Sequence, residues 1–270
     1  MYEVGISTFQ SETDKSFFKS LAGGGIYNIE ISRSDYDGFN FIKTKKLADE
    51  HNINIWSLHL PFMPFETLDL SSADKSIRNH TVDELRKIIK KASDIGIDKF
   101  VVHPSGEPIS DDERPERLKY AKESLSYLAD TAGESGAVIC AEDLPRTCIG
   151  HSVEEMKFLT SDDNRLKICF DTNHITIQNP EDAILALSDK IVTLHISDFD
   201  FEDERHMLPG EGKINWNAVL SSLKKINYSG IWLYEVVKSP KTIVRSRDLT
   251  PADFKRNAGQ IFAGKALDII

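Results

Sequence analysis

Short apolar runs alternate along this chain with longer segments in which apolar residues recur at helical spacing. The short runs are rich in Val and Ile and are apolar almost throughout. That pattern is typical of strands in a parallel sheet that is covered on both faces. Eight such runs are predicted to be strands: 2–7, 26–31, 53–59, 99–103, 137–142, 166–171, 191–196 and 230–236.

The segments between the predicted strands have the periodicity of amphipathic helices. In the segment 73–95, for example, Leu85, Ile89 and Ala92 fall on one face, and Lys and Arg side chains fall on the other. Helices are predicted over 11–21, 39–51, 73–95, 117–134, 152–159, 180–187, 216–225 and 251–265.

Repeated alternation of strand and helix predicts a barrel. The two patterns alternate eight times without a linker or a change in composition, and 270 residues is a normal length for a chain of this kind. The Gly23-Gly24-Gly25 run precedes a strand, so it is expected to form a turn and not the phosphate loop of an open sheet. We therefore expect residues 1–270 to form one domain, a single (β/α)8 TIM barrel.

Acidic and imidazole side chains stand where the predicted strands end. In barrels of this kind the active site lies at that end, which is the C-terminal face. The fifth to the eighth predicted strands end at Glu142, Asp171, His195 and Glu235. Three carboxylates gathered there would repel one another, and a cation would remove the repulsion. We expect one divalent ion, namely Mn²⁺, Mg²⁺, Co²⁺ or Zn²⁺, because the donor set is oxygen and nitrogen without thiolate.

Composition and charge narrow the classes of function. The chain is 40% hydrophobic and 28% charged, so it can bury a large core. The net charge of −10 argues against a dedicated nucleic-acid binder, although charge can be local. The beginning of the chain lacks a signal-peptide pattern, and no apolar run approaches transmembrane length. We therefore expect a cytoplasmic protein without a membrane partner, either a monomer or a homodimer.

The three cysteines do not suggest a disulfide framework or a thiolate zinc site, because they are few and scattered. Cys140 and Cys169 stand two residues before Glu142 and Asp171, on the same face of their strands. Both are expected to pack in the barrel beneath the carboxylates.

Seven short motifs are similar in type and order to those of the xylose isomerase-like barrel superfamily, and more narrowly of its sugar phosphate isomerase/epimerase branch. They are SLHLPF (57–62), VVHP (101–104), AED (141–143), FDTNH (170–174), LHISD (194–198), ERHMLPGEGKINW (204–216) and YEV (234–236). The resemblance implies one metal ion on the four residues named above and a small sugar as substrate. It implies substrate contacts by His174 and Arg205, and the remaining candidates for the pocket are His59, His103 and His206.

The resemblance also implies a reaction. A proton would move at a carbon next to a carbonyl, through an enediolate that the metal stabilises. Glu142 and Glu235 would flank the substrate, one removing the proton and the other returning it. Return to the opposite face gives epimerisation, whereas transfer to the adjacent carbon gives isomerisation.

Three other readings of the same residues stay open. A sister group, of the endonuclease IV type, holds three zinc ions at nearly the same strand ends and cleaves DNA at abasic sites. Its further ligands would be His59, His103, His174, His206 and an acidic residue, with Glu204 at the place of the Asp in its D-R-H motif. The acidic net charge and the lack of basic or aromatic insertions argue against it. An inosose dehydratase-like lyase would use similar ligands, and a non-catalytic barrel would bind metal weakly.

Overall fold

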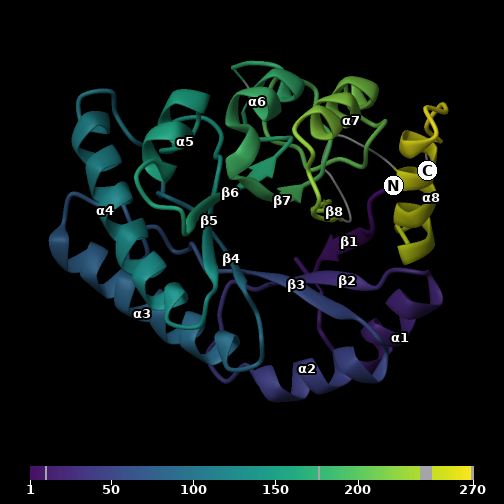
Figure 1. Cartoon of the computed structure of the whole chain (residues 1–270), viewed down its shortest axis with the longest axis horizontal. Coiled ribbons are helices and arrows are strands. Elements are labelled where there is room, and N and C mark those ends of the chain that lie inside the picture. Colours follow the sequence, from purple (N-terminus) through teal and green to yellow (C-terminus); the bar gives the residue numbers. More distant parts are fainter. Residues whose placement is uncertain (10, 176, 238–244, 269–270) are drawn as a thin grey trace.

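The chain forms a (β/α)8 barrel, as predicted, in a computed structural model that describes residues 1–9, 11–175, 177–237 and 245–268 (Figure 1). The strands are β1 (Val4–Ser7), β2 (Asn28–Ser32), β3 (Asn54–His59), β4 (Lys99–Val102), β5 (Val138–Glu142), β6 (Leu166–Asp171), β7 (Ile191–His195) and β8 (Trp232–Tyr234). The helices are α1 (Lys15–Gly23), α2 (Phe41–Glu50), α3 (Lys75–Ser93), α4 (Arg114–Gly133), α5 (Val153–Thr160), α6 (Pro180–Leu187), α7 (Trp216–Lys225) and α8 (Pro251–Phe262), with a short 3-10 helix η1 (Ser188–Lys190) before β7.

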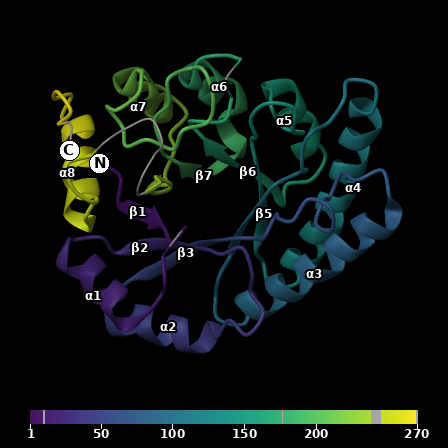
Figure 2. The same cartoon turned by 180° about the vertical axis from the view of Figure 1, so that it is seen from behind.

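The eight strands lie side by side in the order β7-β6-β5-β4-β3-β2-β1-β8, and each paired neighbour is parallel. The two ends of this order meet through Ile196, whose N–H donates to the carbonyl of Leu233 at 2.8 Å. Both views show the helices outside the ring of strands (Figures 1 and 2). Because all the strands run in parallel, their carboxyl ends come together at one mouth of the barrel.

The observed elements follow the predicted ones closely. Three helix bounds differ by three residues or more. The helix α1 begins at Lys15 and not at residue 11, α8 ends at Phe262 and not at Lys265, and α4 begins at Arg114 and not at Arg117. Pro115 explains the earlier start, since proline is well suited to the first turn of a helix. No helix in the described ranges combines the length and the apolarity needed to cross a membrane.

A bulge in β3 shifts its pairing with β2 and thereby changes the contacts of its side chains. Ile29 pairs with Ile55, but the next pair joins Glu30 to Ser57, so Trp56 is an extra residue in β3. The indole Nε1 of Trp56 donates to the hydroxyl of Thr193 in β7 at 3.0 Å. The bulge breaks the strict alternation of a strand. It thereby allows Trp56 to bond β7 while Ser57 donates to the Glu30 carboxylate at 2.8 Å.

The strand residues below the barrel mouth pack as expected. Cys140, Cys169 and Val101 form a small buried cluster that is separate from the main core. Burial raises the pKa of the Cys140 thiol to about 12, so this thiol stays protonated. The cysteines therefore fill space beneath the carboxylates of β5 and β6.

The loop between β7 and α7 is fixed by the buried carboxylate of Asp198. This carboxylate accepts hydrogen bonds from the N–H groups of Phe199, Gly210 and Ile214 and from the indole of Trp216. A Cβ atom at Gly212 would lie 2.4 Å from Asp198 Oδ1, so the loop requires glycine there. Asp198 is thus a structural group, and it holds the segment that carries His206.

A buried ion pair joins this loop to the segment that follows β8. The Glu211 carboxylate accepts from Arg245 Nη2 at 2.6 Å and from Arg245 Nε at 2.7 Å. The two side chains are 2% and 4% exposed. A buried pair of this kind is costly to break, because the remaining charge is left without its partner in a region that water does not reach.

We predict that Glu211→Gln lowers the free energy of unfolding by about 1–3 kcal/mol, because the neutral amide weakens the two charge-assisted hydrogen bonds that the carboxylate accepts from Arg245. Urea unfolding measures the change. Glu202→Gln is the matched control and should leave the stability unchanged, since Glu202 is 72% exposed and 4.0 Å from Arg205. Equal stability of Glu211→Gln and the wild type would contradict the structural role of the pair.

Candidate active site

The four side chains predicted to hold a metal meet at the mouth of the barrel. Glu142, Asp171 and His195 end β5, β6 and β7, and Glu235 follows β8. One potential ligand atom from each lies within 4.8 Å of the others. The first three side chains are fully buried, and Glu235 is 7% exposed. The parallel register explains the convergence, since it pairs Asp171 directly with His195.

The imidazole of His195 is surrounded by the three carboxylates. Its Nδ1 atom lies 2.8 Å from Glu142 Oε1 and 3.1 Å from Glu235 Oε2. The same nitrogen is 3.9 Å from Asp171 Oδ2. The Nδ1 edge of this ring therefore faces the space that the four side chains enclose.

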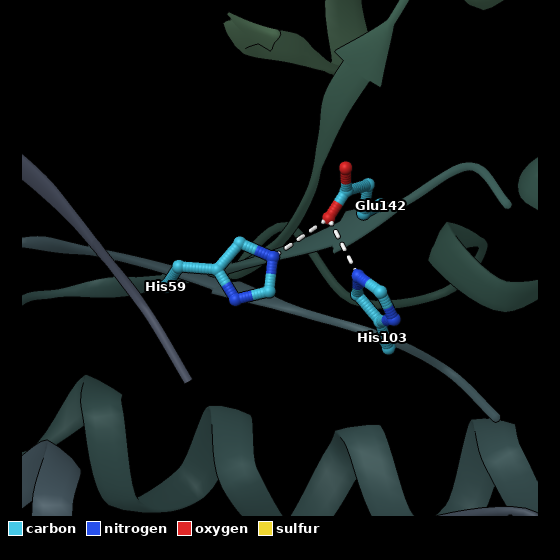
Figure 3. A group of neighbouring side chains, drawn as sticks. All are labelled: His59, His103 and Glu142. Atoms are coloured by element: carbon cyan, nitrogen blue, oxygen red, sulfur yellow. Dashed lines mark hydrogen bonds and ion pairs between the residues drawn. The ribbon is translucent and has the colours of Figure 1, made fainter. Parts of the chain in front are cut away.

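Glu142 also belongs to a second group, with His59 and His103. Its Oε2 atom lies 3.0 Å from His59 Nε2 and 3.1 Å from His103 Nε2. Figure 3 shows both imidazoles directed at this one oxygen, while the other oxygen points away. The ring of Phe62 stacks on His103 with centroids 3.9 Å apart, which restricts the orientation of that imidazole.

A third group contains Asp171, His174 and His206. His174 Nε2 lies 3.7 Å from Asp171 Oδ2. Glu204 Oε1 lies 2.8 Å from His206 Nε2 and 3.6 Å from His174 Nε2. Because Glu142 and Asp171 each belong to two groups, the three groups form one continuous set of donors.

The pKa values in this set show that the carboxylates require positive charge beside them. Burial acts to lower the pKa of His59, but its hydrogen bond to Glu142 and the negative charges of Glu142, Glu30 and Glu235 together raise the value to about 9. Burial also acts to lower the pKa of His206, but its hydrogen bond to Glu204 and the negative charges of Asp171 and Glu235 together raise the value to about 9. Burial raises the pKa of Asp171 to about 6. Burial likewise acts to raise the pKa of Glu142, but its imidazole neighbours hold it well below the usual range.

Two buried ligand atoms in the set have no hydrogen-bond partner among the described residues. They are Asp171 Oδ2 and His174 Nε2. Buried polar atoms are rarely left in this state, because each loses its bonds to water without replacement. A divalent cation would satisfy Asp171 Oδ2 and would replace protons on the imidazoles as the source of positive charge. The donor set therefore fits a metal ion.

Arg205 does not join these groups through any contact in the described ranges. Its Nε donates to Asp200 Oδ2 at 2.9 Å, and its Nη1 lies 3.6 Å from Asp203 Oδ2. The acidic stretch that precedes it in the loop neutralises its guanidinium locally. The structure thus gives no support to the expected substrate contact by Arg205, whereas it places His59, His103, His174 and His206 at the barrel mouth.

Arg146 was not foreseen from the sequence. It follows β5, and its Nη1 donates to Glu204 Oε2 at 2.8 Å while its Nε donates to Glu107 at 3.0 Å. This guanidinium joins the loops after β4, β5 and β7 and fixes the carboxylate that faces His206. No spacing in the sequence indicates the contact, because it depends on the conformations of three loops.

Glu30 was also missed, although the sequence held a signal for it. It stands between Ile29 and Ile31 in β2, is fully buried, and has an oxygen 3.0 Å from His195 Nε2. A lone carboxylate inside an apolar strand is rare unless it has a partner. That rarity could have marked Glu30 as part of the site.

Comparison with known proteins finds similarity to two kinds of enzyme. An uncharacterized protein of Methanocaldococcus jannaschii is 30% identical over 182 residues, which is 67% of this chain and 70% of the relative. The "Probable endonuclease 4" of Acholeplasma laidlawii is 27% identical over 66% of this chain and 68% of its own length. The D-psicose 3-epimerase of Agrobacterium fabrum is 26% identical over 84% of this chain and 81% of its own length.

The fold is shared with a solved structure of another protein. A D-tagatose 3-epimerase-like protein superposes with a TM-score of 0.83 over 97% of both chains, at 24% sequence identity. The family described as "Xylose isomerase-like TIM barrel" matches residues 18–253. That match covers most of the chain and agrees with the eight-stranded barrel and with the motifs at its strand ends. The protein is a member of the xylose isomerase-like TIM barrel family.

Proposed function

We propose that this protein is a divalent-metal-dependent isomerase or epimerase that acts on a sugar or sugar phosphate. The observation that carries the proposal is the buried group of Glu142, Asp171, His195 and Glu235, in which Asp171 Oδ2 has no described hydrogen-bond partner. Similarity to a D-psicose 3-epimerase over 84% of the chain supports a sugar as substrate.

The four residues of this group would hold one Mn²⁺, Mg²⁺, Co²⁺ or Zn²⁺ ion. A bound ion supplies Lewis acidity, which stabilises negative charge as it develops on the oxygen of a substrate carbonyl. His174 and His206 adjoin this group at Asp171, and His59 and His103 adjoin it at Glu142. These four imidazoles would bind and orient the substrate hydroxyls.

Glu142 and Glu235 are assigned the proton transfer. Both carboxylates approach His195 Nδ1, at 2.8 and 3.1 Å, so they face one central space. Although burial opposes it, the nearby imidazoles lower the pKa of Glu235 to about 2, so this group is ionised and can accept a proton. Glu142 has His59 beside it, with which it can exchange a proton. Glu235 would remove a proton from the carbon next to the carbonyl, and Glu142 would return one.

We predict that Glu142→Gln and Glu235→Gln each slow the exchange of that substrate proton by about 10²–10⁴-fold, as expected for loss of a general acid or base. The measurement is uptake of deuterium from D₂O into a panel of ketoses, followed by NMR with the divalent ion present. The metal content of each variant is determined in parallel, because both residues are also proposed ligands.

The same substitution at the exposed Glu154 in α5 is the control and should leave the exchange rate unchanged. A variant that keeps its metal and loses exchange identifies a proton-transfer residue. Exchange at the wild-type rate in Glu142→Gln would refute the assignment.

We also predict that Asp171→Asn makes the metal-free protein more stable, by about 1–3 kcal/mol. Burial raises the pKa of Asp171 to about 6, so holding this group ionised at neutral pH costs folding free energy that an uncharged amide does not cost. Metal should raise the unfolding temperature of the wild type and have little effect on the variant. Urea and thermal unfolding with and without chelator measure the stability of both proteins. The prediction is contradicted if Asp171→Asn is less stable than the wild type without metal and if added metal stabilises the variant fully.

A second candidate function is cleavage of DNA at abasic sites with several zinc ions. It is favoured by the three adjoining donor groups, which share Glu142 and Asp171, and by the 27% identity to a "Probable endonuclease 4". The net charge of −10 opposes it, since phosphate backbones are bound by positive charge. Incision of a duplex with one abasic site, in the absence of proton exchange on any ketose, would favour this candidate.

A further inference from the structure

Glu30 is a buried carboxylate beside the site that the proposed reaction does not use. It belongs to β2, whereas the four proposed ligands belong to strands β5 to β8 and their ends. Its side chain is fully buried. It does not belong to any of the three potential metal-binding groups among the described residues.

The carboxylate of Glu30 meets the ring edge of His195 that is turned away from the proposed metal. Its oxygens lie 3.0 and 3.2 Å from His195 Nε2. The other ring nitrogen, Nδ1, faces Glu142 and Glu235. One imidazole therefore bridges Glu30 and the proposed ligand group, with a different nitrogen turned to each.

A second hydrogen bond fixes Glu30 in this position. The hydroxyl of Ser57 in β3 donates to Glu30 Oε2 at 2.8 Å. Ser57 pairs with Glu30 because of the β3 bulge at Trp56, which sets the register at this point. The orientation of the carboxylate thus follows from the pairing of the two strands.

The contact decides which nitrogen of His195 carries a proton. A carboxylate is an acceptor only, so Nε2 must bear hydrogen to bond with it. Nδ1 also lies against carboxylates, 2.8 Å from Glu142 Oε1, so it carries hydrogen as well while no metal is bound. A metal ion would displace the proton on Nδ1, and the N–H kept at Nε2 would leave the Nδ1 lone pair directed at that ion. A carboxylate behind an imidazole also increases the basicity of the ligating nitrogen.

We propose that Glu30 is a positioning residue that holds His195 with its proton on Nε2 and so presents Nδ1 to the metal. This inference rests on the proposed function, since it assigns a role toward the metal of that site. Glu30 itself touches neither metal nor substrate. Removing its charge should therefore lower the affinity for metal and change which nitrogen of the His195 ring carries the proton.

The variant that tests the proposal is Glu30→Gln, which keeps the shape of the side chain and removes its charge. A glutamine can also donate its amide hydrogens to Nε2, and that would shift the proton of His195 to Nδ1. We expect the affinity for Zn²⁺ or Mn²⁺ to fall by about 10–100-fold, the usual effect of losing such a partner. Ser57→Ala leaves the charge and removes only the orienting hydrogen bond, so it should give a smaller decrease.

Glu3→Gln is the matched control. Glu3 precedes β1, is exposed, and accepts a hydrogen bond from Asn28 on the side of the barrel away from the site. Titration with a competing chelator gives the affinity of each variant, and circular dichroism verifies that each is folded. The ¹⁵N shifts of the His195 ring in zinc-loaded protein should show Nε2 protonated and Nδ1 bound to metal in the wild type and in Glu3→Gln.

The outcomes separate this inference from the proposed function. Weaker zinc binding and an altered ring signature in Glu30→Gln, with an unchanged control, support the role of Glu30. Equal affinity and an identical ring signature in the wild type and Glu30→Gln overturn that role and leave the metal site intact. Absence of metal binding in the wild type overturns both.

Discussion

Negative charge gathered where water does not reach is the constraint on which this site depends. Glu142, Asp171 and Glu30 are fully buried, and Glu235 is nearly so. Ionised groups in such surroundings are costly unless an opposite charge lies beside them. In the metal-free protein the imidazoles supply that positive charge by holding protons. One bound divalent ion would supply two positive charges at a single place. The raised pKa values of His59, His174, His195 and His206 follow from this requirement, and so does the proposal that a metal ion binds there.

The barrel brings together charged side chains that are not neighbours in the sequence. Glu142 and Glu235 are far apart in the sequence, yet both approach the same nitrogen of His195. The parallel register alone produces this meeting, because every strand delivers its last residues to one face. The loop after β7 adds His206, and its own stability comes from Asp198 and from the buried pair of Glu211 and Arg245. The structural parts of the loop are therefore distinct from its functional parts.

The sequence was sufficient to predict the positions of residues that are determined by periodicity or by strand order. The alternating patterns predicted the barrel, and the polar residues at strand ends predicted the group of Glu142, Asp171, His195 and Glu235. It was insufficient where loop conformation decides. The ion pairs of these loops could not be predicted: Arg205, whose substrate contact stays a prediction, bonds Asp200 in its own loop, while Arg146 reaches Glu204 from another loop. The role of Glu30 depends on a bulge at Trp56, and strand patterns do not reveal a bulge.

The most direct test of the central claim is the identity and number of metal ions per chain, measured by elemental analysis of protein purified without chelator. The account predicts one Mn, Mg, Co or Zn ion per chain, held by the group around His195. Removing that ion should abolish proton exchange on the substrate, and restoring it should return the activity. A chain that carries no divalent ion and binds none on addition would contradict the account. Two or three zinc ions per chain would contradict the single-ion site and favour cleavage of abasic DNA.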